Sequence, residues 1–550
     1  MNDTASAGQS TALPAAEGPY RSMAEAVEEW VVAEPDRIAI VDADGEEVDY
    51  RTFGARSGAL AADLIDRLSG PGARVGVYMR NCSAFLETYI GASAGSMTPF
   101  NINFRYTAPE IAYLLGNADA EAVVVHREFQ SVLRDALVDS PSVRVVYVVD
   151  DGTEPIDHPT ADDAGAAEWV DYRSVRSADR TVEGRGNGDD LMFLYTGGTT
   201  GMPKAAMWRQ GDLVKLYTGT MRALAAQSDL GDVQLTTLTV APLMHGTGLI
   251  SQLSNLFDGG KVVITGAHRF VASDVIDLLE RYRVHVLTLV GDPFAAPLRD
   301  ALDADPDRDL GSLAVISSSG AMWSQPVKEG LLEHLPDVTL YDSFASSEAM
   351  GLGASVTRRS AAATTTATFA LGDRANVLAD DGSWVEPGSG VPGRIAVREP
   401  VPIGYFKDAK KSAETFVEVG GVRYSVPGDY VMVEHDGSLT LLGRGSSCIN
   451  TGGEKVYPEE IEETLKLHDA VEDAACLGLP DERFGETVCA VVQVRPGASP
   501  TADELIEHCR SRLARYKAPR TIVLVDDLMR APNGKLDRPS LKALAIERAS

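Results

Sequence analysis

The chain has 550 residues, 44% of them hydrophobic and 24% charged, and a formal net charge of −30, so it is long enough for two or more hydrophobic cores. So negative a charge repels phosphate groups. We therefore do not expect nucleic acid or an anionic membrane surface to be a main partner. The sequence contains no run of about 18 apolar residues and no signal-peptide pattern, so we expect no membrane insertion and a cytoplasmic location.

In chain order, residues 1–21 are rich in Ala, Ser, Thr and Gly and are predicted to form a mobile tail. From Ser22 onward, helical patterns alternate with short apolar strands, which predicts an α/β body with mostly parallel sheets. The expected strands are 37–41, 74–78, 122–125, 145–149, 191–195, 235–241, 261–264, 284–290 and 313–317. The acidic, glycine-rich stretch around residues 150–190 is expected to be a surface connection.

After about residue 370 the apolar runs become shorter and are separated by glycines, which indicates a small β-rich subdomain. The remainder of the chain, from about residue 445, is long enough for a separate small α+β domain. Its expected elements are helices 458–466 and 502–515 and strands 474–479, 487–494 and 521–525.

The segment 194–204, L-Y-T-G-G-T-T-G-M-P-K, carries the strongest functional signal. Its three glycines allow consecutive backbone N–H groups to converge on an anion, and its threonines add hydroxyl donors. Lys204 supplies a positive charge for terminal phosphates, although the spacing differs from that of a P-loop, where the lysine directly follows a glycine. The apolar run before the loop fits a strand-to-helix phosphate turn, and it fits a Gly/Thr-rich hairpin equally well.

Residues 196–204 resemble the signature loop of the adenylate-forming (ANL) superfamily, which includes acyl-CoA synthetases, luciferases and peptide-synthetase adenylation domains. The resemblance covers the chain from about Ser22 to its end. It implies a large N-terminal adenylation domain (residues 22–443) of two α/β subdomains plus a small β-rich subdomain, a hinge (444–447) and a small mobile α+β lid domain (448–550). It also assigns these residues to the binding of ATP: Thr196, Gly197, Gly198, Thr199, Thr200 and Lys204.

Residues 341–348, Y-D-S-F-A-S-S-E, resemble the N-x-Y-G-x-T-E segment of the same superfamily. The resemblance makes Asp342 an acceptor for the adenine amino group and Phe344 a stacking surface. It makes Ser347 a donor to the α-phosphate and Glu348 the oxygen ligand of the Mg²⁺ that accompanies ATP. The same nucleotide site is expected to include Ser319, Gly320, Ala321 and Ser343.

Two further segments resemble the family's T-G-D and G-R motifs and its R-x-x-x-G-K ending. The first would make Asp429 an acceptor for the ribose hydroxyls and Arg444 a donor to ribose or phosphate oxygens. The second makes Lys535 the candidate catalytic lysine. Its ammonium would neutralise charge as a carboxylate oxygen attacks the α-phosphorus, without a covalent enzyme intermediate.

Residues 444–461 resemble the hinge region, with Ser446 at the pivot position. The sequence G-G-E-K-V-Y-P-E-E is similar to that of actinobacterial fatty-acid and steroid-acid CoA ligases. Asn450 stands where the family commonly has a lysine. Residues 241–248, A-P-L-M-H-G-T-G, resemble the segment whose histidine lines the acid pocket. His245 is therefore counted with the catalytic centre as a pocket-lining residue, and the expected pocket consists of His245, Gly246, Thr247, Val290 and Gly291.

The leading interpretation is a carboxylate:CoA ligase that uses ATP and Mg²⁺ to make an acyl-adenylate and then a thioester. An alternative with the same first half is a diazotase, which adenylates nitrite for attack by an aryl amine. A nucleotide-binding scaffold without catalysis is a third interpretation, and the joint presence of Glu348, Asp429, Arg444 and Lys535 argues against it. A homodimer is expected only from the resemblance to the family, and the identity of the acid is left open.

Overall fold

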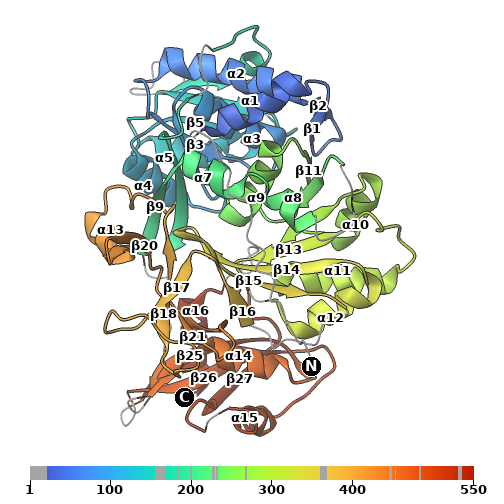
Figure 1. Cartoon of the computed structure of the whole chain (residues 1–550), viewed down its shortest axis with the longest axis vertical. Coiled ribbons are helices and arrows are strands. Elements are labelled where there is room, and N and C mark those ends of the chain that lie inside the picture. Colours follow the sequence, from blue (N-terminus) through green and yellow to red (C-terminus); the bar gives the residue numbers. More distant parts are fainter. Residues whose placement is uncertain are drawn as a thin grey trace, which may run out of the picture.

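The computed structural model describes residues 21–154, 167–182, 186–198, 201–225, 230, 233–266, 269–321, 323–359, 368–444, 449–451, 454–456, 458–481, 485–513, 515–530 and 536–549. Apart from Arg21, the expected N-terminal tail lies outside these residues. The described chain forms three sheets, with the C-terminal sheet at the opposite end of the molecule from α1 (Met23–Ala33) and α2 (Tyr50–Arg67) (Figure 1).

The first sheet has seven strands in the order β7-β6-β5-β3-β4-β8-β9 and is parallel except for its last pair. Its strands are β3 (Arg74–Tyr78), β4 (Thr98–Asn101), β5 (Ala120–His126), β6 (Val145–Val149), β7 (Glu168–Asp171), β8 (Leu191–Gly198) and β9 (Gly201–Arg209). Its connecting helices are α3 (Ser83–Ala94), α4 (Ala108–Ala118), α5 (Gln130–Leu137) and α6 (Tyr172–Arg176). Every residue of β6 is buried, as its unbroken apolar run predicts for a strand covered on both faces.

The second sheet begins as a parallel sheet with antiparallel β2 (Glu47–Asp49) at its edge. Its parallel strands are β1 (Ile38–Val41), β10 (Thr236–Thr239), β11 (Lys261–Ile264), β12 (Val286–Leu289), β13 (Val315–Ser319) and β14 (Thr339–Ser346). The helices between them are α9 (Gly246–Phe257), α10 (Ala272–Arg281), α11 (Asp292–Ala304) and α12 (Gln325–His334). In α10, Val275, Ile276 and Leu279 are buried at helical spacing, so its apolar stripe faces the core.

The expected β-rich subdomain continues this second sheet, because β15 (Ala349–Thr357) pairs with both β14 and β16 (Thr368–Leu371). Antiparallel pairing then extends the sheet through β22, β21, β18, β20 and β19, with β17 alongside β18. These strands are β17 (Ala375–Leu378), β18 (Gly393–Arg398), β19 (Phe416–Val419), β20 (Val422–Ser425), β21 (Asp429–Val433) and β22 (Ser438–Arg444). The prediction of two α/β parts and a β-rich part is confirmed, with the β-rich part joined to its neighbour by one fifteen-stranded sheet.

The C-terminal part forms a five-stranded sheet with its own buried clusters. Its elements are β23 (Ile449–Thr451), β24 (Glu454–Val456), α14 (Pro458–Lys466), β25 (Val471–Asp481), β26 (Gly485–Val494), α15 (Ala502–Arg510), β27 (Thr521–Val525) and α16 (Arg538–Ala549). Helix α15 ends five positions before the expected residue 515. Ser511 and Arg512 turn their side chains back to the carbonyl oxygen of His508, which satisfies the helix end there.

The expectation of a surface connection before residue 190 is wrong. The supposed surface connection contains β7, which pairs with β6, and α6, whose N-cap Asp171 accepts from the backbone N–H of Arg173. Of the two alternatives left open for the phosphate loop, the structure has the hairpin, because the segment after Pro203 forms β9 and pairs antiparallel with β8. Within the described ranges, no helix has both the length and the apolar character needed to cross a membrane.

Candidate active site

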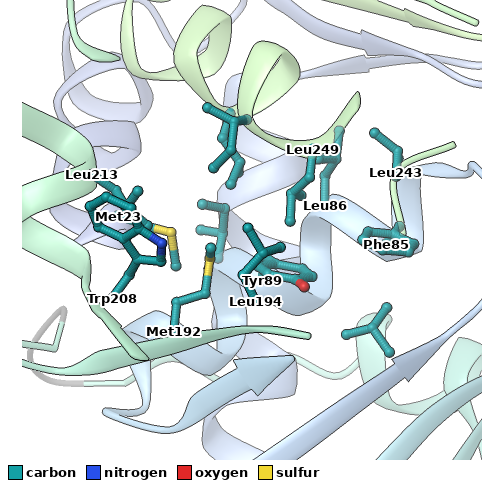
Figure 2. Packing of buried hydrophobic residues seen from close by; sticks show 14 of the residues in the cluster. Met23, Phe85, Leu86, Tyr89, Met192, Leu194, Trp208, Leu213, Leu243 and Leu249 are labelled. Atoms are coloured by element: carbon teal, nitrogen blue, oxygen red, sulfur yellow. The ribbon is translucent and has the colours of Figure 1, made fainter. Parts of the chain in front are cut away.

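The base of the β8–β9 hairpin is fixed in the hydrophobic core. Figure 2 shows Met192, Leu194 and Trp208 of the hairpin among side chains of α3, α7 (Gln210–Tyr217) and the start of α9, and all three are almost fully buried. The indole N–H of Trp208 also donates to the carbonyl oxygen of Ser347 at 2.9 Å. This bond ties the phosphate-loop hairpin directly to the 341–348 segment.

At its tip the hairpin pairs Thr196 with Lys204 and Gly198 with Gly201. The predicted nucleotide ligands Thr199 and Thr200 lie outside the described residues, as do the side-chain positions from Thr196 to Met202. The Lys204 ammonium forms an ion pair with Asp408, which also caps α13 (Ala409–Thr415) through the backbone N–H of Lys411. The lysine that the sequence assigns to phosphate therefore rests against a carboxylate in this structure.

Asn101, at the end of β4, connects the hairpin to the predicted acid pocket. Its amide group exchanges hydrogen bonds with the backbone of Tyr195, at 2.9 and 3.1 Å, and donates to the carbonyl oxygen of Met244 at 2.8 Å. Met244 directly precedes His245, the N-cap residue of α9. The side chain of Asn101, which is buried, thus holds the phosphate hairpin and the histidine segment side by side.

The first turn of α9 places the predicted pocket residues close to the hairpin. A methyl group at Gly246 would lie 3.3 Å from Leu194, and one at Gly248 would lie 2.7 Å from the carbonyl oxygens of Ala241 and Pro242. Only glycine permits this approach at position 248. Tight packing therefore explains two glycines of the H-G-T-G motif and fixes where His245 and Thr247 stand.

The predicted base-binding segments lie on neighbouring parallel strands. Ser319 on β13 pairs with Ser343 on β14, and Ser318 pairs with Asp342. Gly320 follows at a φ of 93°, and a Cβ on it would lie 3.7 Å from Thr247 and 3.9 Å from Val290. Parallel strands bring their carboxyl ends to one edge of the sheet, so the nucleotide segments and the pocket segments meet there.

Gly291 and Phe344 complete this edge. The backbone N–H of Gly291 donates to the hydroxyl of Ser318 at 2.9 Å, which anchors the pocket wall on β13. Phe344 is half-buried and packs its ring 5.4 Å from that of Phe369. Phe344 pairs with Gly353 on β15, so the hairpin that carries the aromatic residue is part of the sheet.

The adenine-site candidate Asp342 is buried and has a cation beside it. Lys328 on α12 donates to its carboxylate at 3.1 Å, and both side chains are nearly inaccessible to solvent. Burial raises the pKa of Asp342, while the Lys328 cation opposes this effect. The resemblance to known motifs gave Asp342 but not Lys328.

Glu348, the candidate metal ligand, follows the same hairpin. Its carboxylate accepts a hydrogen bond from the hydroxyl of Tyr405 at 2.8 Å. The segment containing Tyr405 runs along β9, with backbone bonds that join Ile403 to Met207 and Phe406 to Ala205. One connecting segment, residues 403–408, therefore contacts both Glu348 and Lys204, and the sequence interpretation did not include it.

Asp429 and Arg444 face each other across the β21–β22 pair, as expected for two groups that contact one ribose. Asp429 is buried, whereas the side chain of Arg444 lies beyond the described atoms. Glu459 of α14 approaches Gly443, where an added Cβ would overlap its carboxylate at 1.8 Å. Burial, reinforced by Glu462, raises the pKa of Glu459 to about 8.

The C-terminal part also lies against the N-terminal part beside the predicted acid pocket. A cavity of about 270 Å³ lies between the two parts and is lined by Asp292, which follows Gly291, and by Arg530. Arg530 is the last described residue before the 531–535 segment that ends in Lys535. Lys535 and the hinge residue Ser446 both lie outside the described residues, so their assignments stay predictions.

The AMP-binding enzyme family matches residues 27–406, and the AMP-binding enzyme C-terminal domain family matches residues 460–535. The chain belongs to the AMP-binding enzyme family. The first range contains the β8–β9 hairpin with Asn101, His245 and Glu348, and the second contains β25, β26 and β27 of the small C-terminal sheet. The predicted relationship to the adenylate-forming superfamily is therefore confirmed, and the protein is an enzyme of this family.

Curated relatives of this AMP-binding enzyme span nearly the whole chain. A medium/long-chain fatty-acid and 3-oxocholest-4-en-26-oate CoA ligase from Mycobacterium marinum is 38% identical over 94% of this chain and 95% of its own. A 3-oxocholest-4-en-26-oate CoA ligase from Rhodococcus rhodochrous is 37% identical over 94% of each.

Solved structures share the fold at lower identity. The anthranilate CoA ligase AuaEII superposes with a TM-score of 0.82 at 21% identity, over 97% of this chain and 99% of that one. ATP-bound MatB from Rhodopseudomonas palustris gives 0.79 at 22% identity, over 96% and 100%. The large N-terminal part and the small C-terminal part are the arrangement of these enzymes.

Proposed function

We propose that this protein is an ATP-dependent carboxylic acid:CoA ligase. In the first step a carboxylate oxygen attacks the α-phosphorus of ATP, which forms acyl-AMP and releases pyrophosphate. In the second step the CoA thiol attacks the acyl carbonyl, which forms the thioester and releases AMP. The observation that carries this proposal is the bond from Trp208 to Ser347, because it joins the phosphate hairpin to the base-binding segment in a chain whose relatives are CoA ligases.

The described residues support separate roles in nucleotide binding. Lys204 would leave Asp408 for the phosphates, since a phosphate group offers more negative charge than one carboxylate. Asp342 would accept from the adenine amino group and Asp429 from the ribose hydroxyls. Arg444 would donate to the same ribose or to a phosphate oxygen.

The donor set around Glu348 fits Mg²⁺. A carboxylate is a hard oxygen ligand, and the Tyr405 hydroxyl fixes one of its oxygens so that the group has a defined orientation. When bound with ATP, Mg²⁺ supplies charge neutralisation on the phosphates. The work of the chain is then to hold Glu348 in place and to align the acid near His245 and Thr247 with the α-phosphorus.

Lys535 is proposed as the adenylation lysine. Rotation of the C-terminal part about residues 444–447 is proposed to carry Lys535 away from the active site after adenylation and to bring a CoA-binding face of the same part toward it.

The test is Lys535→Ala in separate half-reactions. Acid-dependent pyrophosphate release is expected to fall by at least about a thousandfold, in line with loss of a major charge-stabilising group. Thioester formation from a supplied acyl-adenylate is expected to stay within about threefold. Equal loss of both steps would contradict the assignment.

The relatives favour a large apolar acid as substrate, either a medium- or long-chain fatty acid or a steroid side-chain acid. The two relatives are named as CoA ligases, so they also favour the CoA ligase reaction over the diazotase reaction, which uses nitrite and an aryl amine. A panel of aliphatic, aromatic and steroid acids and nitrite, each with CoA or an aryl amine, separates the two reactions. Thioester from an acid supports the ligase, whereas nitrite-dependent pyrophosphate release with a diazonium product would replace it.

A further inference from the structure

Lys328 is a buried cation with one buried anionic partner. It lies in the first turns of α12, its residue is 4% exposed, and its ammonium is 3.1 Å from the carboxylate of Asp342. The ammonium also lies 5.3 Å from the centre of the Trp323 ring, which is itself 1% exposed. The lysine is therefore held by an ion pair on one side and an aromatic face on the other.

Stability alone is a weak reason for such a pair. Burying two charges removes the hydration of each ion, and apolar residues of similar volume often stabilise a core as well or better. The neighbours of Lys328 on α12, Val327 and Leu331, are apolar and buried in the second core. An apolar residue at position 328 would fit this helix, so the cation calls for another explanation.

The pairing of strands β13 and β14 provides such an explanation. Asp342 pairs with Ser318 on β13, and the next pair, Ser343 and Ser319, leads directly to Gly320 at the edge where the nucleotide site opens. Lys328 contacts the Oδ2 atom of Asp342. A carboxylate has acceptor capacity on both oxygens, so a cation fixed on one of them sets the direction of the other.

We propose that Lys328 is a positioning residue that keeps Asp342 an anionic, fixed hydrogen-bond acceptor and thereby makes the site select ATP over GTP. This inference rests on the proposed function, in which Asp342 accepts from the adenine amino group. Adenine presents a donor at its 6-position, and guanine presents an acceptor there. A carboxylate attracts the first and repels the second, whereas a protonated carboxyl group can donate to the guanine oxygen.

The charges around Asp342 indicate why the cation is needed. Burial raises the pKa of Asp342, and Asp292 at the start of α11 raises it further. Lys328 is the group that lowers it. Asp292 in turn faces Lys466 of the C-terminal part, 3.8 Å away. Without Lys328, Asp342 would hold its proton up to a higher pH and would become a donor.

The experiment compares Lys328→Met, Asp342→Asn and the double variant with wild type. ATP and GTP affinities are measured by calorimetry without acid, and kcat and KM are measured from acid-dependent pyrophosphate release at pH 6.5 and 8.5. Lys517→Met serves as the matched control, since it removes a half-buried lysine paired with Glu460 at 2.6 Å in the C-terminal part. The control is expected to leave both affinities unchanged.

Lys328→Met is expected to weaken ATP binding and raise the KM for ATP about tenfold, the effect of losing one well-oriented hydrogen bond, with kcat within about threefold. The ATP/GTP preference is expected to fall about tenfold at pH 6.5 and to fall less at pH 8.5, because a higher pH favours the charged form of Asp342. Asp342→Asn leaves a buried ammonium without its anion and is expected to be the least stable variant.

The double variant removes both charges and so provides a test that does not depend on a destabilised protein. Its amide can turn its oxygen to adenine or its nitrogen to guanine, so ATP affinity is expected within about threefold of wild type while the ATP/GTP preference falls about tenfold. Retention of the wild-type preference in the double variant, or an unchanged preference at pH 6.5 in Lys328→Met, would overturn the role of Lys328. If wild type releases no pyrophosphate with any acid, the proposed function fails, and the calorimetric ATP/GTP ratio still tests Lys328.

Discussion

The ammonium of Lys466 lies 3.8 Å from Asp292 and 3.0 Å from Asp473, so one buried cation joins the two parts of the chain. Asp292 begins α11 and directly follows Gly291 of the predicted acid pocket. Asp473 also binds Arg530. Burial would raise the pKa of Asp473, but Lys466 and Arg530 lower it to about 2. Asp473 thus holds the Lys466 cation within the C-terminal part, and the same cation contacts the N-terminal part through the carboxylate of Asp292.

Asp292→Asn is expected to weaken docking of the C-terminal part by about 1 kcal/mol, a factor of about five, because it removes the negative charge that faces Lys466. Since Arg530 leads to Lys535 and shares the cavity with Asp292, the adenylation step is expected to slow about fivefold. Thioester formation from supplied acyl-adenylate is the second readout. Asp300→Asn, on the same helix, is the control; a slower thioester step with normal adenylation would show that this orientation serves the second reaction.

Asp408 competes with phosphate for Lys204 in this account. Asp408→Asn removes the ion pair but preserves the cap of α13, because asparagine caps helices as well as aspartate does. The KM for ATP is expected to stay the same or fall by up to about threefold, whereas Lys204→Met raises it at least about tenfold. Lys407→Met, which removes a neighbouring ion pair to Asp119, is the control. Equal increases for Asp408→Asn and Lys204→Met would mean that Asp408 positions the lysine for ATP.

Tyr405→Phe removes the hydroxyl that orients Glu348. If Glu348 binds Mg²⁺, the Mg²⁺ concentration for half-maximal pyrophosphate release is expected to rise about tenfold, the usual effect of losing a partner of a metal ligand. The rate at saturating Mg²⁺ should change by less than about threefold. As the control, Tyr430→Phe removes a comparable hydroxyl-to-carboxylate bond, 2.8 Å to Asp380, that does not involve Glu348. An unchanged Mg²⁺ requirement in Tyr405→Phe argues against Glu348 as the ligand.

The raised pKa of Glu459 predicts how the stability of the protein depends on pH. Because burial raises its pKa from 4.5 to about 8, the folded protein binds the proton more tightly than the unfolded chain. The free energy of unfolding therefore falls as the pH rises from about 5 to 8, and the loss is complete above 8. Glu459→Gln is expected to raise the thermal unfolding midpoint at pH 8.5, by an amount worth at least about 1.4 kcal/mol, and to have little effect at pH 5. Glu460→Gln is the control, and a pH-independent difference would rule out this titration.

Regular elements could be predicted where local pattern and tertiary burial agree. Strand β3 (Arg74–Tyr78), helix α14 (Pro458–Lys466) and strand β27 (Thr521–Val525) have the predicted bounds. Strand β7 was missed because none of its residues is buried and acidic residues occupy its two ends. The β8–β9 hairpin was one of two alternatives for the phosphate loop, because the local sequence fits a hairpin and a strand-to-helix turn equally well, and only the pairing with β8 decides between them.

The site shows the same division between local and distant information. Asp342, Ser347 and Glu348 occur in one recognisable segment, so their proximity followed from the sequence. Their partners Lys328, Trp208 and Tyr405 come from three other segments and contact them only through the sheet and its connections. Such pairs carry no local pattern, and the fold alone brings them together.

The most direct test of the proposed function is mass analysis of the products from one turnover with a long-chain or steroid acid and ATP. Without CoA, acyl-AMP and pyrophosphate are expected to form in equal amounts on the enzyme, and addition of CoA should convert acyl-AMP to acyl-CoA and AMP. Formation of ADP and phosphate, or acyl-AMP that CoA does not consume, would contradict the account.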